Sequence, residues 1–250
     1  MRRYDIDIEA PIDEVTELAI RYVAVRRTIA NALADSSRLT REYASQVLRD
    51  IADTHVEMAI EFIDRLIDAL SRPEALTRYN ALAILHLIAN VDVRVIDRAW
   101  EGIEECLYDE HSGEVRLGAF RLLTMYGAST PTRSKRAWPL ISDALRCYHG
   151  DPEFVTMLNE FMEMIVGDID DDVRKEVNAY FKFDAANAHG PLKRKAMAIV
   201  RMTARRRTPR STPAPKKAPA KTTPVPKTPA KKPSTKASAK TPAKKKPAKK

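Results

Sequence analysis

The fold is decided by three stretches that share one pattern: REYASQVLRDIA at residues 41–52, RYNALAILHLIA at residues 78–89 and RLGAFRLLTMYG at residues 116–127. Each begins with Arg, has Ala three residues later, and has large apolar residues at offsets of seven and ten. These offsets lie on one face of an α-helix. The stretches are therefore predicted to be amphipathic helices, and the small residue allows a neighbouring helix to approach closely.

Two weaker copies of the pattern begin at Phe154 and at Lys193. Their corresponding face residues are Met157, Phe161 and Met164, and then Ala196, Val200, Thr203 and Ala204. Successive copies start 37, 38, 38 and 39 residues apart. Five copies with so little drift in spacing indicate an internal structural repeat.

A second apolar segment with helical spacing precedes each copy. These segments cover residues 15–33, 56–70, 95–107, 138–148 and 173–183. Residues typical of helix N-termini support these helices. Pro follows Asp151 and Gly190, and Ser112 and Asp171 are suitable N-caps. We predict about ten helices in five antiparallel pairs.

A helix pair that repeats every 37 to 39 residues resembles the HEAT/armadillo class of α-helical repeat protein. The best single match is Val115-Arg116 followed by Ala119 and Leu123. The tetratricopeptide pattern fits worse, because its period is about 34 residues and its Trp-x-x-Leu-Gly-x-x-Tyr motif is missing. The resemblance implies an all-α, right-handed α-solenoid in the domain 1–204, with a concave surface lined by the second helices that binds a protein.

The C-terminal segment, residues 205–250, has a different composition. Its 46 residues include 13 Lys, 4 Arg and 10 Pro, and none is acidic or aromatic. The net charge of this tail is +17. The other 204 residues have 26 Lys and Arg and 34 Asp and Glu, so their net charge is −8. With almost no apolar surface to bury, the tail is predicted to be disordered and extended.

The tail resembles linker-histone C-terminal tails, with Lys-Thr-Pro-Ala-Lys-Lys at residues 227–232 and again at 240–245. Lys dominates over Arg and aromatic residues are absent, which favours neutralisation of nucleic-acid phosphates without recognition of bases. The predicted nucleic-acid-binding residues are Arg205, Arg206, Arg207, Arg210, Lys216, Lys217, Lys221, Lys227, Lys231, Lys232, Lys236, Lys240, Lys244, Lys245, Lys246, Lys249 and Lys250. The open alternatives are another polyanion, or a tail that only aids solubility.

Four groups of residues in the body are candidates for binding, metal or catalytic sites. The basic residues that head the copies, Arg41, Arg78, Arg116 and Lys193, are predicted to pair with neighbouring carboxylates and to be structural.

Cys106, His111, Cys147 and His149 are the best candidates for metal ligands. Equivalent residues in adjacent repeats lie about 10 Å apart, whereas zinc needs every ligand within about 2.3 Å of one centre. We therefore predict no metal, with buried cysteines and loop histidines. Residues 168–172 (DIDDD) are similarly predicted to act at a helix N-terminus and not as a calcium loop.

Trp100 and Glu104 lie one helical turn apart. HEAT-like alkylpurine DNA glycosylases use aromatic residues and a carboxylate on the concave face, so this resemblance supplies one alternative function. An RNA- or ribosome-associated scaffold is the other.

Other features of the sequence argue against a membrane-spanning or a secreted protein. No apolar run approaches a membrane span, residues 1–9 lack the apolar core of a signal peptide, and two cysteines favour an intracellular protein. No catalytic residue or cofactor site is predicted. The sequence predicts a non-enzymatic adapter that is cytoplasmic and nucleoid-associated in a bacterium, or nuclear in a eukaryote.

Overall fold

The computed structural model describes residues 6–204, and all of its regular secondary structure there is α-helical. The second helices of the five pairs are α3 (Arg38–Thr54), α6 (Ala75–Val91), α9 (Gly113–Ser129), α11 (Phe154–Val166) and α13 (Gly190–Ala204). The first helices are α1 (Ile12–Arg21) with α2 (Val23–Ala32), α4 (Val56–Ile60) with α5 (Ile63–Ala69), α7 (Val95–Arg98) with α8 (Trp100–Leu107), α10 (Pro131–Cys147) and α12 (Asp171–Asn187). The predicted all-α solenoid is confirmed. Residues 1–5 and the predicted tail, 205–250, lie outside the described residues.

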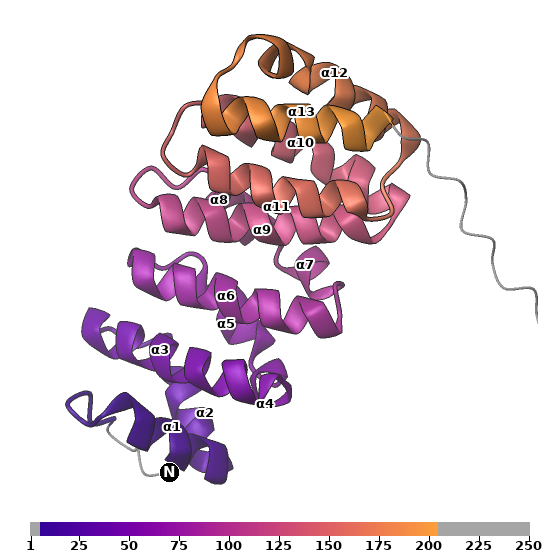
Figure 1. Cartoon of the computed structure of the whole chain (residues 1–250). Coiled ribbons are helices and arrows are strands. Elements are labelled where there is room, and N and C mark those ends of the chain that lie inside the picture. Colours follow the sequence, from indigo (N-terminus) through magenta and orange to yellow (C-terminus); the bar gives the residue numbers. More distant parts are fainter. Residues whose placement is uncertain (1–5, 205–250) are drawn as a thin grey trace, which may run out of the picture. The chain divides into compact units, whose positions relative to one another are not determined.

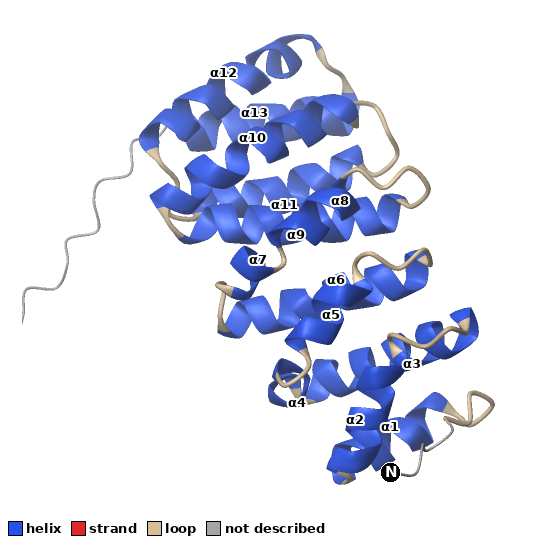
Figure 2. Cartoon of the chain, turned by 180° about the vertical axis from the view of Figure 1, so that it is seen from behind, coloured by secondary structure: helices blue, strands red, loops and turns tan. Residues whose placement is uncertain are grey.

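The second helices stack in chain order in one layer, with α3 on α6, α6 on α9, α9 on α11 and α11 on α13 (Figure 1). The first helices form the other layer, which Figure 2 shows from behind. The predicted face residues of the three strong copies are buried: Ala44, Leu48 and Ile51, Ala81, Leu85 and Ile88, and Ala119, Leu123 and Tyr126. Val200 of the last copy is only half-buried, because no further described repeat covers α13.

Three of the first helices are interrupted, whereas the sequence predicted continuous segments. The clearest case is Tyr22, which is extended (φ −120°, ψ 110°) and separates α1 from α2. The buried Arg26 side chain donates hydrogen bonds to the carbonyl oxygens of Ala19, at 2.7 Å, and Ile20, at 3.4 Å. These are carbonyl groups that a continuous helix would pair with residues 23 and 24, so Arg26 stabilises the interruption.

Helix α10 begins seven residues before the predicted Trp138. Thr130 caps it by accepting a hydrogen bond from the Arg133 backbone N–H at 3.2 Å, and Pro131 occupies the first turn. Pro139, which the sequence placed near a helix start, lies inside the helix. Its ring is on the exposed side, as is Lys135, whose carbonyl group loses its helical donor and is left to water.

The other predicted helix starts had mixed outcomes. Ser112 caps α9 as predicted, accepting from the backbone N–H of Val115 at 3.3 Å. The cap of α12 is Asp170 and not Asp171, and α11 begins at Phe154, two residues after Pro152. No helix within residues 6–204 combines the length and the apolar character needed to cross a membrane.

Candidate protein-interaction surface

The Arg residues that head the three strong copies connect successive repeats. Each guanidinium forms an ion pair with a carboxylate that precedes the second helix of the next repeat, and each also donates to a backbone carbonyl in the loop before its own helix. The ion pairs are Arg41 with Glu74, Arg78 with Asp109, and Arg116 with Glu153. The predicted pairing with neighbouring carboxylates is confirmed for these three arginines, whose contacts we call the inter-repeat ion pairs, but Lys193 forms no ion pair within residues 6–204.

The inter-repeat ion pairs are buried, so they contribute to the stability of the stack. The side chains of Arg78 and Asp109 are only 12 % and 7 % exposed. The Arg41 guanidinium, by its hydrogen bonds, lowers the pKa of Glu74 below its usual value. Such charges, once removed from water, must keep their partners. These arginines are therefore not free to bind a ligand.

The fourth repeat has Phe154 in place of Arg, and a different contact joins it to the fifth. The His149 ring packs on Phe154, with ring centroids 4.8 Å apart, and its Nε2 atom lies 3.3 Å from a carboxylate oxygen of Asp184. In the fifth repeat Lys193 donates to the carbonyl group of Ala186, in the last turn of α12, at 3.3 Å.

The candidate metal ligands do not come together. Cys106 is buried, which raises the pKa of its thiol to about 12, and its Sγ atom lies 3.6 Å from the Leu70 carbonyl oxygen. Cys147 is exposed at the end of α10, so the prediction that both cysteines are buried was wrong for it. Within residues 6–204, no three His, Cys, Asp or Glu side chains gather in a geometry that could hold a metal ion.

The acidic stretch 168–172 lies at a helix N-terminus, as predicted. Asp170 accepts a hydrogen bond from the backbone N–H of Asp172 at 2.8 Å, and Asp171 and Asp172 form the first turn of α12. Carboxylates in this position are stabilised by the helix dipole.

Trp100 and Glu104 lie on α8, in the first-helix layer. The guanidinium carbon of Arg136 lies 4.0 Å from the Trp100 ring centroid, and the Tyr126 ring meets the indole edge-on at 5.4 Å. The indole is half-buried and one of its faces is covered by this cation. The pair thus lies on a first helix, whereas the glycosylase resemblance requires it on the concave face, which we expect the second helices to line.

Polar and aromatic side chains instead gather on the outer side of the second helices. A pocket of about 160 Å³ lies between α3, α6 and α9, lined by Arg49, Tyr79, His86 and Arg121 among others. The Arg49 guanidinium lies over the Tyr79 ring at 4.9 Å. The small residues Ala83 and Gly118 also line the pocket, leaving room between the long side chains.

The row of polar side chains continues along the stack. Arg121 pairs with Glu160 of α11 at 2.7 Å, and Lys195 of α13 donates to Asn159 of α11. We call this row the second-helix face: Arg49, Asp53, Tyr79, His86, Arg121, Asn159, Glu160 and Lys195. It runs across all five second helices.

His86 is the one member of this face with an unpaired buried atom among those described. Burial lowers the pKa of its imidazole, with the charge of Arg121 adding to the effect, so the ring is neutral at pH 7. Its buried Nδ1 atom has no hydrogen-bond partner within residues 6–204.

Sequence reasoning missed this face, although its signal was present. Tyr79 follows the head of its copy by one residue, Arg121 by five, and Arg49 and His86 by eight. These offsets define the helix face next to the buried one. The predicted nucleic-acid-binding residues, Arg205 to Lys250, lie outside the described residues, so the structure places none of them.

Comparison with known proteins supports the fold. No protein-family model matches the sequence, and no curated protein matches it significantly. Computationally designed armadillo repeat proteins for modular peptide recognition align with a TM-score of 0.61 at 14 % identity, covering 76 % of this chain and 91 % of that chain. A designed armadillo repeat protein aligns with a TM-score of 0.59 at 14 % identity, covering 78 % and 88 %.

A third solved structure is a designed armadillo repeat protein in complex with the peptide (KR)4. It aligns with a TM-score of 0.57 at 13 % identity, covering 78 % of this chain and 88 % of that chain. At these identities the likeness concerns the fold alone. The described part of this chain has an armadillo/HEAT-like repeat fold.

Removing one partner of an inter-repeat ion pair will destabilise the body. We expect Arg78→Met to lower the free energy of unfolding by about 3 kcal/mol, because Asp109 is left buried without its partner. Urea denaturation followed by circular dichroism measures this. The control is Arg94→Met, whose exposed pair with Asp92 should matter little. Equal effects of the two substitutions would show that burial does not set the strength of these pairs.

Stability will depend on pH through Glu74. Its folded-state pKa is lowered, so its contribution is complete above the unfolded value of about 4.3 and is lost as the pH falls through the folded value. Urea midpoints should therefore drop below about pH 4, and Glu74→Gln should show a shallower drop, starting from a lower midpoint at neutral pH. Glu163→Gln, an exposed residue on α11, serves as the control. An unchanged pH profile in Glu74→Gln would contradict the assignment.

Proposed function

We propose that this protein is a non-enzymatic adapter, which binds an extended peptide segment of a partner protein on the second-helix face. The observation that carries the proposal is the row of aromatic, cationic and amide side chains that crosses the stack above a buried apolar core. Each of the five second helices contributes at least one such side chain, so the row is long, which suits an extended peptide.

The chemistry of the pocket supports this proposal. The Arg49 and Tyr79 pair offers a flat aromatic and cationic surface, and Tyr and Arg are enriched among residues that dominate binding. The imidazole of His86 lines the same pocket and adds a second flat side chain to this surface. Designed armadillo repeat proteins made for peptide recognition share the fold.

We further propose that the basic tail, residues 205–250, binds nucleic acid without base specificity. Its 17 cations face no acidic residue within the tail itself, and association with phosphates releases counterions. The body carries −8, so the adapter would use one part of the chain for protein and the other for nucleic acid, in the cell interior at the nucleoid or in chromatin.

The peptide site can be tested by selecting a phage-displayed random peptide library on the full-length chain, in high salt to suppress binding to the tail. We expect enriched peptides whose affinity falls about tenfold or more in Tyr79→Ala and in Arg121→Ala. Arg65→Ala, an exposed residue on α5 in the other layer, should have no effect. Peptides that bind all three variants equally would place the interaction elsewhere.

The tail is tested by comparing the full chain with a chain that ends at Ala204. We expect the full chain to bind duplex DNA of any sequence, with a slope of log K against log salt no steeper than about −15, from about −0.9 for each of 17 phosphates. The shortened chain should bind far more weakly. Fluorescence anisotropy with duplex DNA and with single-stranded RNA measures both, and the stronger of the two identifies the natural polyanion. Unchanged affinity without the tail would refute this role.

A further inference from the structure

The first helix pair exposes apolar side chains at the end of the stack. Leu18 is 45 % exposed, Tyr22 is 52 % exposed and Val23 is 44 % exposed. They lie on α1, on the interruption after it, and at the start of α2. Inside the stack each such face is covered by the next repeat, and terminal repeats of soluble solenoids usually have a polar outer face. This end lacks one.

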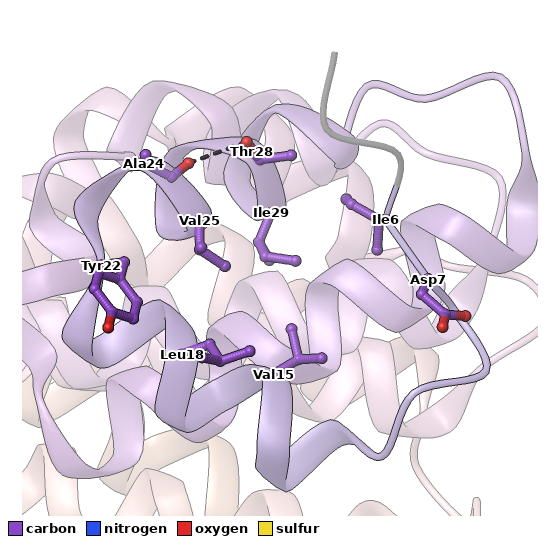
Figure 3. A pocket seen from close by; sticks show the side chains of 9 residues that line it. All are labelled: Ile6, Asp7, Val15, Leu18, Tyr22, Ala24, Val25, Thr28 and Ile29. Atoms are coloured by element: carbon purple, nitrogen blue, oxygen red, sulfur yellow. Dashed lines mark hydrogen bonds between the residues drawn. The ribbon is translucent and has the colours of Figure 1, made fainter. Parts of the chain in front are cut away.

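The same end contains an apolar pocket of about 400 Å³ (Figure 3). Val15 and Leu18 of α1 line one side, and Val25 and Ile29 of α2 line the other. Thr28 also lines the pocket, but its hydroxyl donates to the Ala24 carbonyl at 3.0 Å and is already satisfied. Asp7 stands at one edge of the pocket, and its carboxylate accepts a hydrogen bond from the Glu9 backbone N–H at 3.0 Å. Most of the other lining side chains are apolar, so the pocket favours an occupant that is mainly apolar.

Charges on α1 indicate which occupant fits. Glu14, Leu18 and Arg21 follow each other at helical spacing and are all exposed on one side of α1, while the exposed Asp13 and Glu17 lie on the adjoining side. Neither Glu14 nor Arg21 forms an ion pair within residues 6–204. An antiparallel second α1 that crosses near Leu18 would set each Glu14 opposite an Arg21. The surface is thus complementary to itself, which is what a two-fold symmetric interface requires.

The opposite end of the stack differs in charge. Its exposed apolar residues, Phe183 and Met197, stand beside the exposed cations Lys182, Arg194 and Arg201 of α12 and α13. Pairing of unlike ends would leave the pocket against these cations and would form an open chain of copies. Pairing of like ends buries the apolar side chains and closes the assembly.

We propose that two copies of this protein associate through α1 and α2 about a two-fold axis. Leu18 lies at the axis, the Tyr22 ring of each copy enters the pocket of the other, and Glu14 of each copy pairs with Arg21 of the other. This goes beyond the adapter function, and its consequence is that one particle carries two second-helix faces and two basic tails. Two linked binding segments raise the effective affinity for a polymeric partner.

The test is the oligomeric state of the full-length chain, measured by sedimentation velocity over a wide range of concentrations. We expect a monomer–dimer equilibrium, with the dimer dissociation constant raised about tenfold or more by Leu18→Asp. The control is Val91→Asp, which places the same charge at another exposed apolar residue, 64 % exposed on α6. Circular dichroism establishes that each variant is folded. A chain that stays monomeric throughout overturns the proposal.

A charge exchange tests the geometry. Glu14→Arg alone and Arg21→Glu alone each set like charges against each other across the axis, so each should weaken the dimer. Mixing the two single variants restores both pairs in a heterodimer, which native mass spectrometry detects by mass. A dimer that survives Leu18→Asp, or single variants that do not recover on mixing, would show that another surface is used.

Discussion

One constraint shapes the whole body: no helix pair of this chain can cover its own apolar face. In the first four copies, the residues three, seven and ten positions after the head are buried where the next second helix lies against them, whereas Val200 of the last copy has no further described helix beside it and is half-buried. The stack is therefore the unit of stability, and each interior repeat depends on two neighbours. The same constraint explains why an end of the stack exposes Leu18 and Tyr22, since nothing among the described residues lies beyond them.

Polar residues on the second helices divide into two groups by offset. The head position directs its Arg into the junction between repeats, where Arg78 and its Asp109 partner are almost fully buried. Offsets of one, five and eight place Tyr79, Arg121 and His86 outside the core. The first group defines how repeats fit together, because an unpaired buried charge is costly in any other arrangement. The second group lies outside these junctions, and for that reason the proposed peptide site is placed on it.

The charges of the chain divide in a similar way. Body arginines are largely engaged with body carboxylates, as in Arg121 with Glu160 and Arg116 with Glu153. The cations of residues 205–250 have no acidic neighbour in sequence. Because counterion release requires cations that are not already neutralised, the tail is the better suited of the two for phosphates. The body, in contrast, presents the side chains of the second-helix face on a stack of helices.

The sequence by itself determined the helical repeat, its period and the buried face, because these depend on spacing within single helices. It also predicted that the basic residues at the heads of the copies form ion pairs with carboxylates, but it did not identify those carboxylates. Glu74, Asp109 and Glu153 stand at different distances from the heads that follow them, so only packing of whole repeats selects them. Tertiary structure likewise decided the interruption at Tyr22, where Arg26 binds the freed carbonyls, and the exposure of Cys147. Each of these depends on groups brought together across turns and repeats, which no local pattern records.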